Sequence, residues 1–337
     1  MKKKQLLSII IAGAVIMAVG ITGIASNVIS KKLIGDSEKK QEIFDTTFSS
    51  LWGAKEGIEL PEKDFVGVIN IVGEISSNVS RSSQDSYNHS LYMDYIEEME
   101  ESDYNKGIML YVNTPGGGVY ESDELYLKLM EYKEKTKRPV WAYFASEACS
   151  GGYYISMAAD KIYANRNCWT GSIGVIVSML NCKDLYDKLG IKQINIASGK
   201  NKAMGAAGDK LTDEQRDILQ GLVDEAYDQF VGIVCQGRNL DDGTIRALAD
   251  GRIYSAKQAK EKQLIDEIDS YENEKKEFTK QLGCAQDITF YAPSSGASEW
   301  FSTIFGAIEK IMPKSDVQLA TDIVENKGSG VLKYYAE

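Results

Sequence analysis

Apolar, β-branched runs alternate with amphipathic segments along the middle of this chain, and that alternation limits the fold more than any other feature. Apolar runs bounded by turn residues predict buried strands, whereas apolar residues at three- and four-residue spacing predict helices. Their alternation predicts an α/β domain with a mostly parallel sheet, whose ligands bind at the carboxyl ends of the strands. The predicted strands are Phe65–Val72, Gly107–Val112, Pro139–Ala145, Ile162–Ala164, Ile173–Val177 and Ile191–Ala197, and the predicted helices are His89–Ser102, Tyr120–Lys135, Ser150–Ala159, Cys182–Leu189, Thr212–Arg238 and Asp242–Ala249.

The segment Ala148-Cys149-Ser150-Gly151-Gly152-Tyr153-Tyr154-Ile155 follows one of these strands and begins a helix. Ser150 is therefore expected at a strand-to-helix turn, beside the free N–H groups and the positive end of the helix dipole. This setting suits a nucleophilic hydroxyl. It also suits a plain helix N-cap, because serine is a favoured cap residue. Both interpretations stay open on this segment alone, and the cap is the more common use of such a serine.

A second glycine-rich turn, Pro115-Gly116-Gly117-Gly118, follows the preceding strand. Both turns lead from a strand to a helix, so we expect them at the same edge of the sheet. Backbone N–H groups with no side chain over them suit an oxyanion hole. A phosphate-binding loop is an alternative, but no Lys-Ser/Thr pair follows as in a Walker motif. A plain turn is the third interpretation.

The chain holds a single histidine, His89, in a polar stretch that is typical of an exposed surface loop. A Ser-His-Asp triad would have to use it, and the loop composition speaks against that role. A lysine is the other partner that activates a serine, because burial favours its neutral amine. Lys200 and Lys202 follow the last predicted strand in Ala197-Ser198-Gly199-Lys200-Asn201-Lys202. Solvated turn lysines are the simpler interpretation of this spacing taken alone.

The cysteines and the net charge exclude several classes of site. The five cysteines form no C-x-x-C pair, so neither a disulfide framework nor a zinc site is expected. Cys149 adjoins Ser150 and is a rival nucleophile, although neighbouring residues on a turn point in different directions. The net charge of −11 argues against nucleic acid as a partner, because phosphate binding requires clustered Lys and Arg.

The N-terminal region carries an apolar run, residues 6–29, after three lysines. At about 1.5 Å per residue this run is long enough to span a bilayer. We expect an uncleaved anchor rather than a signal peptide, because the run exceeds a usual signal-peptide core. The short preceding tail favours a main domain outside the cytoplasm. The expected parts are a tail 1–5, a transmembrane anchor 6–29, a linker 30–62, the main domain 63–295, and a C-terminal amphipathic helix with a mobile tail 296–337.

Five motifs occur in an order that resembles the S49 family of serine peptidases, of the signal peptide peptidase A type. They cover roughly residues 65–270, and the ordered set is far more specific than any one motif. The resemblance implies a ClpP/crotonase-like fold, a repeated ββα superhelix with a mostly parallel sheet, in the single-copy form with one N-terminal transmembrane helix. The motifs are Asn113-Thr114-Pro115-Gly116-Gly117-Gly118, Ala148-Cys149-Ser150-Gly151-Gly152-Tyr153-Tyr154, Thr170-Gly171-Ser172-Ile173-Gly174-Val175, Ser198-Gly199-x-x-Lys202 and Gly251-Arg252-Ile253-Tyr254.

The resemblance also implies a role for individual residues. Ser150 matches the nucleophile, and the S-G-x-x-K spacing selects Lys202 rather than Lys200 as the general base. Gly117 and Gly151 match the two donors of the oxyanion hole, and Ser172 matches a serine that orients the lysine. Cys149 stands where the family often has a small residue, which keeps a thiol near the site.

The expected function is therefore that of a membrane-anchored serine endopeptidase that degrades hydrophobic peptides such as remnant signal peptides. The chemistry of a Ser-Lys dyad requires no metal or nucleotide. The resemblance further implies ring- or dome-shaped homo-oligomers in which Ser150 and Lys202 of one site come from neighbouring subunits. An apolar stripe over residues 300–311 fits such a subunit contact. The expected partners are thus peptides, the lipid bilayer and further copies of the chain, and not nucleic acid.

Three further hypotheses remain open. A crotonase-type acyl-CoA enzyme would share the fold and its glycine-rich oxyanion turns. A non-catalytic scaffold at the membrane would keep the fold without the chemistry. The C-terminal segment Val331–Glu337 resembles a peptide substrate in composition, so it is a candidate for occupying the cleft and restraining the enzyme.

Overall fold

The computed structural model of the protein describes residues 58–77, 87–284, 288–293 and 333–335. The expected transmembrane anchor 6–29, most of the linker 30–62 and the apolar stripe over residues 300–311 lie outside these residues. Within the described ranges, no helix combines the length and the apolar character that crossing a bilayer requires.

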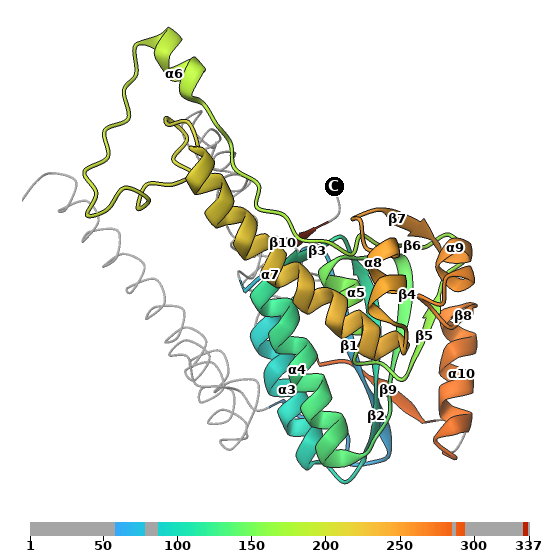
Figure 1. Ribbon diagram of the computed structural model, residues 1–337. Helices are drawn as coiled ribbons and strands as arrows, with labels where there is room; N and C mark the ends of the chain where they lie inside the picture. The colour runs from blue at the N-terminus through green and yellow to red at the C-terminus, as the bar shows by residue number, and fades with distance from the viewer. Residues whose placement is uncertain (1–57, 78–86, 285–287, 294–332, 336–337) are drawn as a thin grey trace, which may run out of the picture. The chain divides into compact units, whose positions relative to one another are not determined.

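A mixed, mostly parallel sheet forms the centre of the described part (Figure 1). Its main path runs in the order β7-β6-β4-β2-β1-β9, and every pairing along it is parallel except β6 with β7. The start of β4 pairs with β5, which pairs with β8, while the end of β4 pairs with β6. The strands are β1 Phe65–Val72, β2 Asn105–Thr114, β4 Val140–Cys149, β5 Lys161–Ala164, β6 Trp169–Gly171, β7 Ile253–Ser255, β8 Glu267–Ile268 and β9 Thr289–Tyr291.

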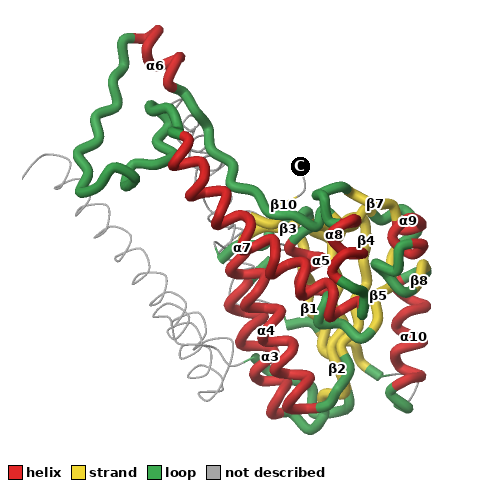
Figure 2. Tube along the Cα trace, in the orientation of Figure 1, coloured by secondary structure: helices red, strands yellow, loops and turns green. Residues whose placement is uncertain are grey.

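Helices cover both faces of this sheet, with α3, α4 and α7 on one side and α10 on the other (Figure 2). Several of them begin at side-chain caps, as helix termini require: Asn88 caps α3, and Thr212 with Gln215 forms a capping box on α7. The helices are α3 His89–Glu101, α4 Val119–Thr136, α5 Gly151–Ser156, α6 Lys183–Leu189, α7 Asp213–Arg238, α8 Asp242–Leu248, α9 Ala256–Glu261 and α10 Tyr271–Gln281.

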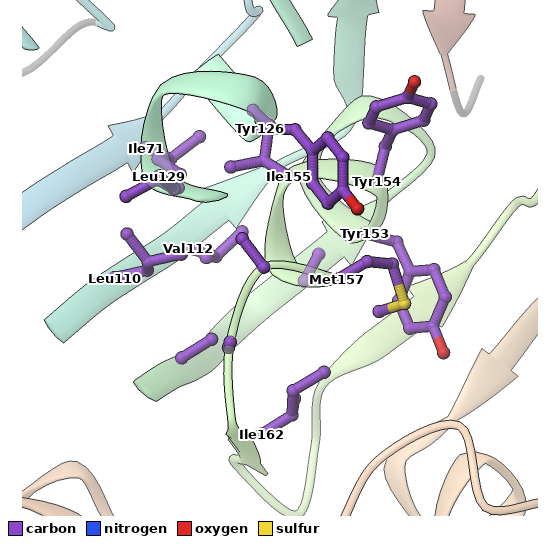
Figure 3. Close-up of a cluster of buried hydrophobic side chains, with 14 of the residues drawn as sticks. Ile71, Leu110, Val112, Tyr126, Leu129, Tyr153, Tyr154, Ile155, Met157 and Ile162 are labelled. Carbon is purple, nitrogen blue, oxygen red and sulfur yellow. The ribbon is translucent and has the colours of Figure 1, made fainter. Parts of the chain in front are cut away.

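The larger core lies between the sheet and the helices α3, α4, α5 and α7. Aliphatic side chains of the strands pack there against aromatic side chains of the helices (Figure 3). On the other face, an aromatic cluster that includes Trp141, Tyr163 and Phe278 lies beneath α10. Two cores on one sheet hold the strand ends in fixed positions, and those ends carry the candidate site.

The predicted α/β class and most predicted elements are confirmed, but two predicted strands are wrong. Residues 191–197 form no strand, and of residues 173–177 only Ile176 makes an isolated bridge. Ile194 and Ile196 are 81% and 100% exposed, so no neighbouring strand or core satisfies this apolar run. The helix after Ser150 also ends at Ser156, earlier than predicted.

Residues 176–225, which we call the arm, extend away from the two cores, and of the apolar side chains in this range only Val223 packs against the larger core (Figure 1). They comprise α6, the loops around it and the first half of α7, and none of them is buried. Nevertheless the arm carries many exposed apolar side chains: Ile176, Leu180, Leu185, Leu189, Ile191, Ile194, Ile196, Ile218 and Leu222. An apolar surface of this extent on a folded chain is typical of an interaction surface.

Candidate active site

Ser150 lies at the carboxyl end of β4, immediately before α5. Its backbone has φ 52° and ψ −115°, a conformation that costs a non-glycine residue about 1–3 kcal/mol. The backbone is held there by two hydrogen bonds. The N–H of Ser150 donates to the carbonyl of Gly171 at 2.8 Å, and its carbonyl accepts from Tyr154 N–H at 2.9 Å. Strain of this kind persists only where the surroundings impose it, and it is frequent at functional sites.

The side chain of Ser150 decides between the two interpretations of the turn. Ser150 occupies the N-cap position of α5, but its hydroxyl accepts no capping hydrogen bond. The residue is fully buried, and Oγ has no hydrogen-bond partner among the described residues. An unpaired buried hydroxyl costs about 1–3 kcal/mol. The geometry therefore disfavours a capping role and leaves the hydroxyl available for another one.

The glycine-rich turn forms the short strand β3, Gly116–Gly118. Ile75 braces it from one side, because Ile75 N–H donates to the Gly116 carbonyl at 2.9 Å and the Ile75 carbonyl accepts from Gly118 N–H at 2.8 Å. A Cβ atom on Gly117 would lie 2.0 Å from the Ile75 carbonyl oxygen. Sequence reasoning missed Ile75, because it contributes through its backbone and its side chain carries no signal of that role.

The two glycines expected to form the oxyanion hole lie next to each other. A Cβ atom on Gly151 would be 3.3 Å from the backbone nitrogen of Gly117 and 2.4 Å from Ser122 Oγ. The two backbone segments can therefore pack this closely only because these positions are glycine. Gly151 is also the first residue of α5, where an N–H has no acceptor within the helix.

Ser172 lies beside the turn that holds Ser150 and is buried, with φ 48°. Its N–H donates to the carbonyl of Arg252 at 2.8 Å, while the neighbouring Gly171 carbonyl accepts from Ser150 N–H. The structure thus brings together Ser150, Gly151, Gly117 and Ser172, which come from three separate turns. Each of the sequence motifs that contains them ends at the same edge of the sheet.

Cys149 does not compete with Ser150 in this arrangement. It is 1% exposed, and its Sγ lies 3.7 Å from the carbonyl oxygen of Trp169. Burial raises the pKa of the Cys149 thiol to about 12, so the reactive thiolate is scarce near neutral pH.

His89 differs from expectation, because it is not exposed. It is the first residue of α3 and is 8% exposed. Its Nδ1 lies 2.6 Å from the Tyr87 hydroxyl and its Nε2 lies 2.7 Å from Glu124 Oε2. The hydrogen bond from His89 is the largest cause that lowers the pKa of Glu124. Both ring nitrogens are therefore engaged, and Nε2 joins α3 to α4. A polar loop composition could not reveal that contact.

Lys202 lies in the arm, where it is exposed. Since Ser150 Oγ has no partner among the described residues, the single chain does not bring Lys202 into hydrogen-bonding contact with it. Lys200 forms an ion pair with Glu214, at 2.7 Å. In the described part of the chain, no group of three or more His, Cys, Asp or Glu side chains is placed to hold a metal ion.

A segment from the C-terminus reaches the same turn. Residues Lys333–Tyr335 form β10, which pairs antiparallel with β3, so that Tyr334 stands opposite Gly117. β10 also contacts α5, the helix that begins after Ser150. An extended backbone therefore lies across the candidate oxyanion glycines.

Comparison with known proteins identifies the family of the chain. Residues 132–284 match the model of peptidase family S49. A protein of Enterococcus faecium named after signal peptide peptidase SppA is 41% identical over 239 residues, which cover 69% of this chain and 67% of that protein. Protease 4 of Haemophilus influenzae is 29% identical over 77% of this chain and 41% of its own length. Chloroplastic serine protease SPPA of Arabidopsis thaliana is 30% identical over 51% and 25% respectively. The chain belongs to peptidase family S49.

Proposed function

We propose that the protein is a membrane-anchored serine endopeptidase of ClpP/crotonase-like fold, with Ser150 as nucleophile and Lys202 as general base, that degrades hydrophobic peptides such as remnant signal peptides. The observation that carries the proposal is the buried Ser150 hydroxyl, which has no partner among the described residues and lies beside the backbones of Gly117 and Gly151. The name of the Enterococcus faecium relative supports signal peptides as substrates, and the name of the Haemophilus influenzae relative supports proteolysis.

In the proposed reaction, the neutral amine of Lys202 takes the proton of Ser150 Oγ as that oxygen attacks the carbonyl carbon of the peptide. The N–H groups of Gly117 and Gly151 donate to the resulting oxyanion. The lysine ammonium, oriented by Ser172, then gives its proton to the leaving amine. Water hydrolyses the acyl-enzyme by the same sequence, with Lys202 again as the base.

The proposed base has to come from another copy of the chain. Lys202 is exposed in the arm, most of whose apolar side chains find no core in the single chain. Docking of the arm on a second copy would bury both the apolar side chains and the lysine, and burial favours the neutral amine that a base requires. This arrangement makes the isolated chain inactive and the oligomer active.

The pairing of β10 with β3 supports a binding mode for the peptide. An extended substrate would add to β3 as an antiparallel strand, as peptides add to exposed sheet edges elsewhere. The C-terminal tail would then compete with substrate for the same edge. We expect removal of residues 329–337 to raise kcat/KM for a short peptide substrate; an unchanged kcat/KM would count against this competition.

The test is peptide cleavage by the full chain in detergent, compared across Ser150→Ala, Lys202→Ala, Lys200→Ala and His89→Ala. We expect a loss of at least about 10³-fold for the first two variants and near-normal activity for the last two. Mixing Ser150→Ala with Lys202→Ala chains should restore part of the activity, because some mixed sites then hold both groups. Full activity of Ser150→Ala or Lys202→Ala would overturn the dyad.

A further inference from the structure

Three side chains at the base of the arm form a hydrogen-bonded chain that joins three helices. Tyr154, on α5, donates its hydroxyl proton to Asp123 Oδ1 of α4 at 2.6 Å. The same hydroxyl oxygen accepts a hydrogen bond from Gln229 Nε2 of α7 at 2.7 Å. The tyrosine oxygen is therefore a junction between the helix that follows the candidate nucleophile and the helix that carries the arm.

Tyr154 is also coupled directly to the nucleophile turn. Its N–H donates to the Ser150 carbonyl at 2.9 Å, which closes the first turn of α5. Its ring is fully buried and packs on Tyr126 and Phe230, with centroids 5.6 Å and 5.0 Å away. A shift of the Tyr154 side chain therefore reaches the backbone of Ser150 through one hydrogen bond.

The junction lies where α7 leaves the core. Ala226 is the first buried residue of α7, and Gln229 follows it by one turn. Asp213, the first residue of α7, precedes Gln229 by 229 − 213 = 16 residues. This part of the helix is about 24 Å long at 1.5 Å per residue. A rotation of the helix by about 5° at the junction therefore displaces its first residue by about 2 Å. Lys202 precedes this end of the helix and lies two residues after Lys200, whose carbonyl accepts a hydrogen bond from Gln215 of α7.

We propose that the chain Asp123–Tyr154–Gln229 is a positioning device for catalysis, which fixes the angle between the nucleophile helix α5 and the arm. The inference rests on the proposed function, in which Lys202 of one copy must reach Ser150 of another. In a closed assembly of identical copies, the angle within each subunit determines the distance between these two groups. A misplacement of about 1 Å at reacting groups costs up to about 100-fold in rate, so a 2 Å displacement at the arm decides activity.

Two substitutions test the device in the full-length oligomer. Tyr154→Phe removes both hydrogen bonds of the hydroxyl group and keeps the ring. Gln229→Ala removes only the hydrogen bond from Gln229, at an exposed position where the loss of the side chain does not disturb the core. We expect kcat for peptide cleavage to fall about 10- to 100-fold, with KM and the oligomer size unchanged. A purely structural role of the hydrogen-bonded chain would instead raise KM or change the oligomer size.

The chain offers a matched control for each variant. Tyr153 lies on the same helix and is equally buried, but its hydroxyl donates to the Leu264 carbonyl at 2.8 Å, and its ring points away from that of Tyr154 (Figure 3). Gln236 lies on α7 outside the arm and is exposed. Tyr153→Phe and Gln236→Ala should leave both kcat and KM unchanged. In the double variant Tyr154→Phe/Gln229→Ala the loss should not exceed that of Tyr154→Phe, since both remove the same hydrogen bond.

Opposite results would overturn the inference in recognisable ways. Equal losses in Tyr154→Phe and Tyr153→Phe would show a purely structural role, as would a rise in KM that accounts for the loss of kcat/KM. Dissociation of the oligomer, or normal kcat in both Tyr154→Phe and Gln229→Ala, would also reject it. If Ser150→Ala or Lys202→Ala stays fully active, the proposed function fails instead. If those two are inactive and Tyr154→Phe is normal, the inference alone fails.

Discussion

Glu274 is a buried carboxyl group that the surrounding protein does not satisfy. It is fully buried on α10, and neither of its oxygens has a hydrogen-bond partner among the described residues. Burial raises its pKa well above the ordinary value, and the amine of Lys161 offsets this only in part. The native state therefore holds the proton to higher pH than the unfolded chain does. The contribution of this group to stability is fully present below pH ~4.3 and falls as pH rises toward the native pKa.

Glu274→Gln should consequently stabilise the protein at neutral pH. The amide keeps the shape and never ionises, so the gain over the native protein is absent near pH 4 and grows by up to about 1.4 kcal/mol per pH unit within the titration window. Urea unfolding of both proteins at several pH values measures this difference in the free energy of unfolding. Glu277→Gln, an exposed position of the same helix, is the control and should show no such growth. A gain that is the same at every pH would contradict this account.

Glycine is required at position 117 because a larger residue would not fit beside Ile75, and not because the backbone has a positive φ. In Gly117→Ala the new methyl group would lie 2.0 Å from the Ile75 carbonyl oxygen, so β3 must move relative to Ile75. We expect loss of peptidase activity by about 100-fold or more, because the N–H group proposed as an oxyanion donor is displaced. Gly221→Ala is the matched control: it lies within α7 with nothing within 4 Å of the added atom. That variant should keep activity and gain about 0.5–1 kcal/mol in helix stability.

At the scale of elements, α7 is held by its packed half and capped at its exposed half. Ala226, Phe230, Val231 and Val234 are buried, whereas residues before Ala226 are not. The exposed half therefore depends on its capping box, in which Thr212 Oγ1 accepts from Gln215 N–H at 3.2 Å and the Gln215 side chain accepts from Thr212 N–H. Such a cap contributes about 1 kcal/mol.

Removal of this cap should loosen the start of α7 without unfolding the core. In Thr212→Ala the first-turn amide of Gln215 should exchange with deuterium about fivefold faster, corresponding to about 1 kcal/mol of local opening. The conservative Thr212→Ser should exchange as the native protein does. Hydrogen exchange followed by mass spectrometry distinguishes the two variants; faster exchange in the core helices α3 and α4 would contradict a local effect.

At the scale of the whole molecule, the arm has more apolar surface than a solitary chain can bury. Ile194→Ser together with Ile196→Ser should weaken self-association, measured by analytical ultracentrifugation in detergent, because both side chains are exposed in the single chain. Peptidase activity should fall in parallel, because the proposed base Lys202 lies in the arm and would no longer be brought to Ser150 of another copy. Leu127→Ser on α4, which is 55% exposed, is the control and should leave the oligomer intact. A monomeric, fully active arm variant would refute shared sites.

Local patterns in the sequence determined most of the secondary structure and part of the site. The β-branched run Phe65–Val72 was predicted and found at the same residues, and the capping box at Thr212 placed the start of α7 correctly. The turns at Gly117 and Ser150 were expected at one edge of the sheet, and they lie together there. These features follow from spacing and turn chemistry within a few residues, which a sequence displays directly.

Tertiary structure alone decided the features that depend on distant partners. The apolar run 191–197 has the composition of a strand but no neighbour to pair with, and His89 became buried because Tyr87 and Glu124 meet it. Whether Ser150 caps a helix depends on where its hydroxyl points, and the fold left it without a capping bond. The separation of Lys202 from Ser150 likewise depends on where α7 directs the arm. Hydrogen bonds and burial join residues far apart in the chain, and no local pattern encodes which partners meet.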